Sequence, residues 1–480
     1  MQNKVQQTVT NNFLWRFAER CGAQGVSFLV SITLARLLAP EIYGTIALVT
    51  VFITILNVFV DSGLGNALIQ KKDADDLDFS TVFFFNVGIC CVLYIMLFLA
   101  APFIAEFYEK NELVSVVRVL GFILVISGVK NVQQAYVSRT MQFKRFFFAT
   151  LGGTIGAAII GIAMAYCGFG VWALVTQQIF NATVDTIILW ATVKWRPKCM
   201  FSWKRLKILF SFGWKLLVSA LLETSYNNIR QLIIGKMYTS SDLAQYNRGK
   251  QFPELIISNI NTSIDSVLLP VMSKSQDDSQ QIKSMTRRSI KTSTYIMAPL
   301  MMGLAFCAEP IVRLVLTDKW LPCVPFLRIF CITYMFYPVH TANLNAIKAM
   351  GRSDLFLKLE IAKKIVGMTL LLSTMWFGVM AMAYSLLISS VTSQIINSWP
   401  NKKLINYRYL DQLWDILPSI LLAVFMGYCV NLIGLLHLPS IVVLMIQIPM
   451  GAAIYIGASA LLKLEEFEYL LKMVKSFRRK

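Results

Sequence analysis

Long apolar segments recur along nearly the whole chain, and they restrict its possible folds more than any other sequence feature. Fourteen runs contain roughly 20 predominantly apolar residues, the length that an α-helix needs to cross the hydrocarbon core of a bilayer. Only 15% of the residues are charged, whereas soluble domains contain about 25%. The sequence therefore predicts an all-α polytopic membrane protein.

The fourteen expected spans are joined by short polar segments, and none of these is long enough for a separate catalytic domain. An alternative count of 12 or 13 spans stays open, because the first, seventh and eighth runs are unusually polar. The expected spans cover roughly residues 11–38, 42–66, 79–102, 113–135, 145–167, 170–193, 207–236, 247–271, 289–316, 324–347, 356–377, 379–399, 413–434 and 438–462.

Lysine and arginine alternate in abundance from loop to loop, which gives the spans an orientation. With the N-terminus in the cytoplasm, the inner segments carry 31 of the 45 basic residues and the outer segments carry eight. Cytoplasmic loops of membrane proteins are enriched in basic residues, so we expect both termini inside. The net charge of +19 then reflects topology and attraction to anionic lipids, and we expect no nucleic-acid partner.

Cysteine, histidine and phosphate-loop patterns give no sign of catalysis or of a metal. The nine cysteines form no Cys-x-x-Cys pair, and the two histidines are His340 and His437. We therefore expect no metal site and no cofactor. No Gly-rich loop with Lys and Ser or Thr is present, so the chain is predicted not to be an ATPase or another enzyme. His340 stands alone in an apolar span, and we interpret it as a packing residue rather than a proton relay.

Two stretches in the two halves of the chain resemble each other. Residues 36–43 and 236–243 each have a basic residue followed by an acidic–aliphatic pair, and the next spans end near Asp61 and Asp265. We therefore expect two pseudo-symmetric six-helix lobes in the same orientation, around a central cavity. The expected divisions are 1–200 for helices 1–6, 201–400 for helices 7–12, 401–462 for two additional helices and 463–480 for a basic cytoplasmic tail.

Polar side chains form stripes on helices one and two of each expected lobe. Residues three or four positions apart share a helix face, and ionisable groups within a span usually face protein or water. The stripes therefore predict a water-filled cavity lined by these faces. The cavity candidates are Arg16, Glu19, Arg20 and Gln24 on the first span, Asn57 on the second, and Glu223, Tyr226, Asn227 and Arg230 on the seventh.

Other interpretations of the stripes stay open. Arg16, Glu19 and Arg20 also suit an interfacial position, where long side chains reach the headgroups. Polar groups on neighbouring helices also form hydrogen bonds without any ligand. Asp61 and Asp265 lie near the inner ends of their spans, where gating through lobe contact, or capping, is as reasonable as substrate contact.

Several segments resemble bacterial polysaccharide transporters, in the same order and over nearly the whole chain. They are residues 16–20 with Gln24, 35–44, 61–70, 267–274 and 349–352. The sequence is similar to the O-antigen, colanic-acid and teichuronic-acid type flippases of the multidrug/oligosaccharidyl-lipid/polysaccharide exporter superfamily. That superfamily also holds multidrug and toxin extrusion (MATE) transporters and the lipid II flippase.

The resemblance implies a MATE-like fold and a function. Members are thought to move undecaprenyl-pyrophosphate-linked oligosaccharides across the bacterial inner membrane by alternating access, for lipopolysaccharide, capsule or exopolysaccharide synthesis. Cavity arginines are thought to meet the pyrophosphate, and Arg16, Arg20 and Arg230 are the candidates here. A guanidinium stays charged and matches phosphate oxygens with its planar fork. A polysaccharide polymerase and glycosyltransferases are expected partners.

Three other functions use the same features differently. A cation-coupled multidrug exporter should have a cavity dominated by acidic groups, whereas the first span places Arg16 and Arg20 beside a single Glu19. A non-transporting scaffold for polysaccharide assembly would not need the cavity arginines. A membrane polymerase would need catalytic groups in a large outer loop, and the sequence has no such loop.

Overall fold

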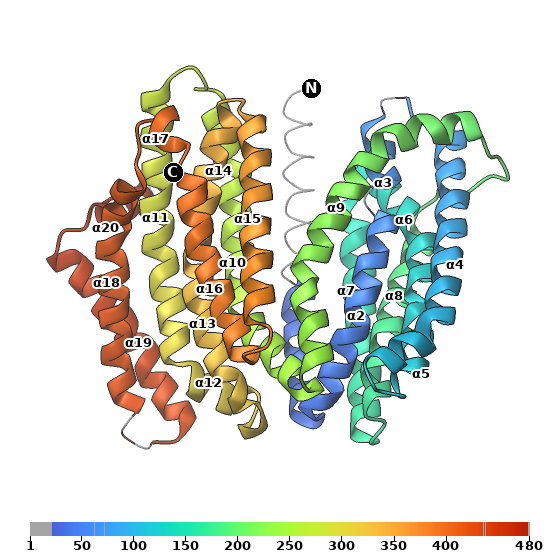
Figure 1. Cartoon of the computed structure of the whole chain (residues 1–480), viewed down its shortest axis with the longest axis horizontal. Coiled ribbons are helices and arrows are strands. Elements are labelled where there is room, and N and C mark those ends of the chain that lie inside the picture. Colours follow the sequence, from blue (N-terminus) through green and yellow to red (C-terminus); the bar gives the residue numbers. More distant parts are fainter. Residues whose placement is uncertain (1–21, 62, 72, 435, 437, 479–480) are drawn as a thin grey trace. The chain divides into compact units, whose positions relative to one another are not determined.

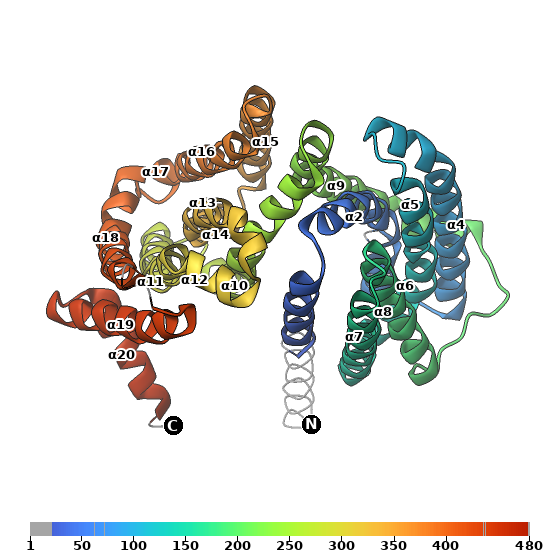
Figure 2. The same cartoon turned by 90° about the horizontal axis from the view of Figure 1, so that it is seen from below.

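The chain folds into two compact helical units. The computed structural model describes residues 22–61, 63–71, 73–434, 436 and 438–478, and every regular element within these residues is a helix. One unit is Met1–Ala244 and the other is Gln245–Lys480. Figure 1 shows the long helices of each unit running side by side, and Figure 2 looks along many of them. The predicted all-α membrane fold is confirmed.

The first unit begins with a helix at residues 22–37. Its other helices are α2 (Pro40–Asp61), α3 (Leu64–Gln70), α4 (Asp76–Phe107), α5 (Leu113–Gly121), α6 (Ile123–Arg139), α7 (Phe143–Tyr166), α8 (Val171–Thr192) and α9 (Trp203–Met237). The boundary between the units falls within the first turns of α10 (Ser240–Ser273).

The second unit contains the rest of α10 and all later helices. These are α11 (Ser279–Phe306), α12 (Ala308–Val315), the 3₁₀-helix η1 (Asp318–Cys323), α13 (Val324–Met335), α14 (Tyr337–Ala349), α15 (Ser353–Thr374), α16 (Val379–Ser398), α17 (Asn401–Leu404), α18 (Tyr409–Gly434), α19 (Ser440–Leu461) and α20 (Glu465–Arg478). The segment expected to be a basic tail is therefore largely helical.

Within the described residues, each of the fourteen predicted apolar runs coincides with a helix or with two consecutive helices. Among the described residues, nine helices are long and apolar enough to cross a membrane, and the α11–α12 pair, bent by 66°, adds a tenth. The first, sixth, seventh and eleventh runs are also helical, but they are shorter or more polar. Fourteen membrane crossings and the division into six-helix lobes stay predictions.

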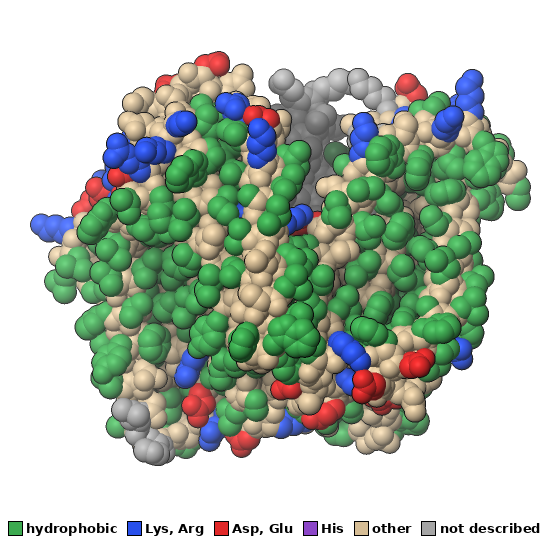
Figure 3. Space-filling model, viewed as in Figure 1, with side chains coloured by type: hydrophobic (Ala, Val, Ile, Leu, Met, Phe, Trp, Pro, Cys, Tyr) green, Lys and Arg blue, Asp and Glu red, His purple; other side chains and the backbone are tan. Residues whose placement is uncertain are grey.

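Apolar side chains cover the outward faces of both units. Phe103, Trp376 and Trp414 are each more than 70% exposed, although exposed aromatic groups of this size are costly in water. In Figure 3 the visible face is mainly apolar, and charged side chains gather toward the ends of the helices. This distribution suits a lipid environment, in which hydrocarbon solvates the helix faces and water solvates the ends.

A buried carboxylate joins three segments at one end of the first unit. Asp78, near the start of α4, is fully buried. Its Oδ2 lies 2.5 Å from Lys71 Nζ and 3.1 Å from Arg205 Nη1. Asp75 and Asp78 also form a reciprocal capping box, which satisfies backbone N–H groups that the start of a helix leaves unpaired. The charged cluster therefore fixes the α3–α4 turn and the start of α9 against α4.

Small residues let α2 approach α9 and the start of α10 closely. A Cβ atom added to Gly44 would lie 1.8 Å from the Ser240 carbonyl oxygen. At the other end of α9, a Cβ on Gly213 would lie 2.8 Å from the Gly63 carbonyl carbon. Membrane helices commonly use such glycines because backbones can then approach without intervening side chains. Backbone contact at these two points aligns α2 antiparallel to α9.

The second unit has a buried amide network in its core. Asn343 on α14 and Gln412 on α18 exchange two hydrogen bonds, of 2.8 and 3.0 Å between their amide nitrogens and oxygens. Asn401 Nδ2 also donates to Asn343 Oδ1 over 2.6 Å. All three residues are fully buried. Because a buried polar group is costly when unpaired, the network ties α14, α17 and α18 together in one arrangement.

Candidate functional site

The predicted stripe on α9 is present in the first unit. Ser202 begins this helix, because its hydroxyl accepts a hydrogen bond from the Arg205 backbone N–H. Asn227 Nδ2 donates to Glu223 Oε1 over 3.1 Å, and both side chains are exposed. Arg230 follows by one turn and is only 9% exposed. The structure thus pairs Glu223 with Asn227, Arg230 follows on the same stretch of α9, and Tyr226 lies half-buried on this helix.

Helix α2 contributes Asn57 beside this stripe. The Gly44–Ser240 and Gly63–Gly213 contacts bracket Asn57 on one helix and the Glu223–Arg230 stripe on the other. Asn57 is half-buried, and within the described part of the chain no hydrogen-bond donor meets its buried Oδ1. Buried polar atoms usually have a partner, so this carbonyl oxygen is an unsatisfied acceptor in the structure.

The remaining cavity candidates are only partly described. Gln24 is half-buried on the helix at residues 22–37. Arg16, Glu19 and Arg20 lie outside the described residues, so their predicted roles stay predictions. The cavity between the two predicted lobes also stays a prediction.

The two aspartates predicted for gating have different outcomes. Asp61 is the last residue of α2, and its side chain lies outside the described set. Asp265 is exposed on α10 and accepts a 3.0 Å hydrogen bond from Asn345 Nδ2 on α14. Asp265 therefore connects two helices of the second unit, and its predicted gating role stays a prediction.

An ion pair inside the first unit was not among the predicted site residues. Lys130 Nζ on α6 lies 3.1 Å from Asp185 Oδ2 on α8, with both side chains at most 20% exposed. Its neighbour Asn131 accepts a hydrogen bond of 3.2 Å from Asn86. Opposite charges in two apolar runs were the sequence signal for this pair, because an unpaired charge within a span is costly. The contact holds α6 against α8.

His340 has the role predicted for it. Asn397 Nδ2 lies 3.2 Å from His340 Nδ1, and Ser390 Oγ lies 3.4 Å from Nε2. An amide N–H can only donate, so Nδ1 is the acceptor and Nε2 carries the proton. Both ring nitrogens are thus satisfied by α16, which confirms the interpretation of His340 as a packing residue. In the part of the chain that the structure describes, no three His, Cys, Asp or Glu side chains are grouped to hold a metal.

Apolar helices, paired intramembrane charges and a polar helix face define a multi-pass membrane protein. The family model described as "Polysaccharide biosynthesis protein" matches residues 33–325. This match covers more than half of the chain, and the chain belongs to that family. The predicted resemblance to bacterial polysaccharide transporters is therefore confirmed.

Several relatives are similar over most of their length. The teichuronic acid biosynthesis protein TuaB of Bacillus subtilis (strain 168) is 25% identical over 424 residues, 88% of this chain and 86% of that protein. The succinoglycan biosynthesis transport protein ExoT of Rhizobium meliloti (strain 1021) is 23% identical over 347 residues, which cover 72% of this chain and 70% of that protein. The lipopolysaccharide biosynthesis protein WzxC of Escherichia coli (strain K12) is 20% identical, covering 78% and 76%.

Solved structures confirm the MATE-like fold. The lipid II flippase MurJ in an inward closed conformation has a TM-score of 0.76 at 15% identity, covering 94% of this chain and 98% of that chain. An inward-facing multidrug resistance transporter of the MATE family has a TM-score of 0.63 at 15% identity, covering 79% and 94%. At these identities the comparison is one of fold.

Proposed function

We propose that this protein is a flippase for undecaprenyl-pyrophosphate-linked oligosaccharide repeat units. It moves them across the bacterial inner membrane by alternating access, for the synthesis of lipopolysaccharide, capsule or exopolysaccharide. Both termini lie in the cytoplasm. No covalent bond is made or broken, so the protein acts as a transporter and not as an enzyme. Membership of the polysaccharide biosynthesis family and the names of its relatives support this proposal.

The observation that carries the proposal is the buried Arg230 within the α9 stripe. A guanidinium keeps its charge in a protein interior and offers paired N–H groups to phosphate oxygens. Burial at 9% exposure lowers the local dielectric, so attraction to a doubly charged pyrophosphate is stronger there than in water. Arg16 and Arg20 are assigned the same role, on the sequence evidence alone.

The neighbouring polar groups suit sugar hydroxyls. The Glu223–Asn227 pair offers carboxylate and amide oxygens as acceptors and an amide N–H as donor. The Asn57 carbonyl oxygen is an additional acceptor. Gln24 and Tyr226 extend this set. We propose that these groups hydrogen-bond the glycan while Arg230 holds the pyrophosphate.

A polysaccharide polymerase that consumes the exported units, and glycosyltransferases that make them, complete the proposed pathway. Anionic lipids of the cytoplasmic leaflet are proposed to attract the basic inner loops.

The experiment replaces Arg230 in a strain that lacks the chromosomal gene. Lipid-linked repeat units on each membrane leaflet are counted after expression of wild type, Arg230→Lys or Arg230→Ala. One lost charge-assisted contact to phosphate corresponds to about a tenfold or greater loss of export. We expect that loss for Arg230→Ala, and an intermediate rate for Arg230→Lys, which keeps the charge but not the fork.

The control is Arg313→Ala, which removes an exposed arginine that pairs with Glu309 and Asp318 in the second unit. It should export at the wild-type rate. Size-exclusion profiles and melting temperatures of the purified variants separate loss of binding from loss of folding. Wild-type export by a folded Arg230→Ala variant would refute the role of Arg230. If the strain that lacks the gene lost drug efflux but exported its glycan normally, the flippase assignment would be refuted.

A further inference from the structure

A basic pocket lies between α11 and α20 in the second unit. It encloses about 450 Å³. Seven of its lining residues come from successive turns of α11, and the other three come from α20. The lining residues are Gln280, Lys283, Ser284, Arg287, Arg288, Lys291, Thr292, Glu465, Glu466 and Tyr469.

Two of the four cations in this pocket are neutralised by carboxylates. Arg287 donates three hydrogen bonds, of 2.7, 2.8 and 3.0 Å, to the Asp415 carboxylate of α18. Lys291 Nζ lies 2.6 Å from Glu465 and 3.0 Å from Glu466, in the first turn of α20. The hydrogen bond from Lys291 holds the pKa of the Glu465 carboxyl below its usual range. These pairs fix the walls of the pocket.

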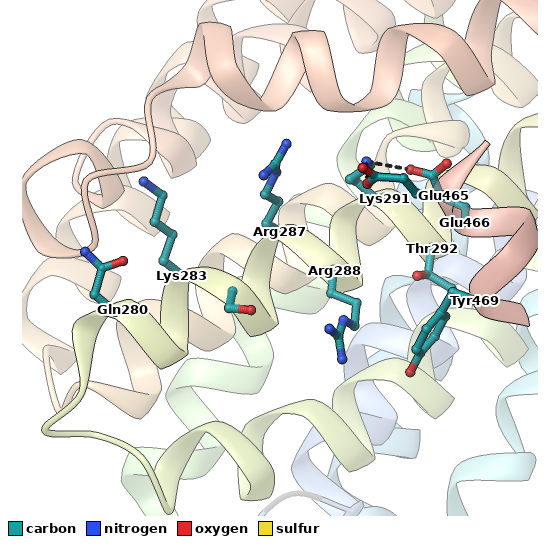
Figure 4. Close-up of a pocket in the computed structure, with 10 residues that line it drawn as sticks. Gln280, Lys283, Arg287, Arg288, Lys291, Thr292, Glu465, Glu466 and Tyr469 are labelled. Carbon is teal, nitrogen blue, oxygen red and sulfur yellow. Dashed lines mark hydrogen bonds and ion pairs between the residues drawn. The ribbon is translucent and has the colours of Figure 1, made fainter. Parts of the chain in front are cut away.

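The other two cations have no carboxylate partner among the described residues. Lys283 makes no ion pair or hydrogen bond there, and Arg288 lies over the Tyr469 ring at 5.2 Å. In Figure 4, Lys283, Arg287 and Lys291 extend from one side of α11, and Arg288 extends from the other side toward Tyr469, so Lys283 and Arg288 border the pocket from two edges. Ser284 also lines the pocket and adds a hydroxyl donor. An ammonium, a guanidinium and a hydroxyl group together suit the oxygens of a phosphate.

The helix that closes the pocket has the character of a membrane-surface helix. It runs across the direction of α11, directly after the apolar α19 ends (Figures 1 and 2). Leu461, the last residue of α19, and Leu462, the next residue, are 85% and 66% exposed, and Leu471 on α20 is also exposed. Exposed Lys472 and Lys475 share this short helix. Apolar and basic groups combined in this way favour the boundary between acyl chains and anionic headgroups.

We propose that the α11–α20 pocket binds the headgroup phosphate of an anionic membrane phospholipid. Lys283 and Arg288 attract the headgroup from the two edges of the pocket and turn toward its phosphate when the lipid binds, and the exposed leucines around α20 contact the acyl chains. The lipid then joins α20 to α11, next to the Lys291–Glu465 ion pair. This site is independent of the proposed transport function, because it shares no residue with the α9 stripe.

The experiment measures lipid binding to the purified full-length protein in detergent. Native mass spectrometry follows titrations with phosphatidylglycerol, phosphatidylcholine, glycerol phosphate and inorganic phosphate. We expect phosphatidylglycerol to bind, and Lys283→Ala/Arg288→Ala to weaken that binding about tenfold or more, because two charge-assisted contacts are lost. Both side chains are at the surface of α11, so the double variant should keep its fold.

The matched control is Lys402→Ala/Lys403→Ala, which removes two exposed charges from α17 in the same unit. It has the same net charge as the test variant and should bind phosphatidylglycerol as wild type does. Equal weakening in both double variants would overturn the site and leave only a general charge effect. Equal binding of phosphatidylcholine, or binding of glycerol phosphate or inorganic phosphate as tight as that of phosphatidylglycerol, would overturn the assignment to an anionic lipid.

Discussion

Substituting Gly44 by alanine should destabilise the first unit measurably. The new Cβ would lie 1.8 Å from the Ser240 carbonyl oxygen, whereas real Cβ atoms essentially never approach a heavy atom within 3.0 Å. The two backbones must therefore separate by about 1.2 Å, the difference between these distances. Overpacking of this kind costs about 1–3 kcal/mol, and contact with rigid backbone places Gly44→Ala at the upper end.

The helix itself gains from the same substitution, because alanine is favoured over glycine in a helix by about 0.5–1 kcal/mol. The net loss is then about 2 kcal/mol. For a unit of this size, that loss lowers the melting temperature by about 4–8 °C. The assay is thermal unfolding of the purified protein in detergent, followed by intrinsic fluorescence.

The matched control is Gly88→Ala in α4, where an added Cβ meets no heavy atom within 4 Å. This variant gains the same helix preference without the clash, so its melting temperature should equal or exceed that of wild type. A Gly44→Ala protein that melts at or above the Gly88→Ala protein would refute the close approach of α2 to the start of α10.

Three further predictions concern other contacts. Asp78→Asn should lower the free energy of unfolding by about 2–3 kcal/mol, because two cations lose a buried carboxylate. The control Asp76→Asn changes a half-exposed ion pair and should lower it by less than about 1 kcal/mol. Equal melting temperatures of the two variants would contradict this prediction. Asn343→Ala should cost about 3 kcal/mol by leaving buried amides unpaired, and an unchanged melting temperature would show that the network is not stabilising. The lowered pKa of Glu465 means that its ion pair with Lys291 is intact above about pH 5 and is lost as the pH falls through the lowered pKa. The distance between spin labels on α11 and α20 should therefore increase only in acid. An increase that is already present at pH 7 would contradict the ion pair.

Apolar periodicity predicted the helices well, because a span must be both long and apolar. Residues 79–102 and 413–434 were predicted as spans, and α4 and α18 contain them. The breaks were not predicted. The 289–316 run was expected as one span, but it bends by 66° between α11 and α12. A bend depends on what the two segments pack against, and one-dimensional hydropathy does not contain that information.

The candidate site was partly predictable, because residue spacing determines which side chains share a helix face. Four-residue spacing placed Glu223 and Asn227 on one face of α9, and a hydrogen bond joins them. The opposite charges of Lys130 and Asp185 in two apolar runs were a signal for their pairing. The pairing of Arg205 with Asp78 was not predictable, because the two residues are distant in sequence and lie outside the apolar runs. The pocket at α20 was also missed, since the segment was interpreted as a charged tail. The role of Glu465 and Glu466 in this segment is visible only in the structure, where both lie beside Lys291.

The Asp78 cluster has a consequence for biogenesis. Its first cation, Lys71, lies seven residues before the carboxylate, but its second, Arg205, follows 127 residues later. Membrane proteins are synthesised from the N-terminus, and early segments fold before later ones exist. A nascent chain that ends after α8 therefore holds Asp78 with Lys71 as its one cation of this cluster, and it lacks α9, one of the helices that α2 packs against. The first unit becomes complete only when α9 emerges from the ribosome, so α9 is the segment that closes its assembly.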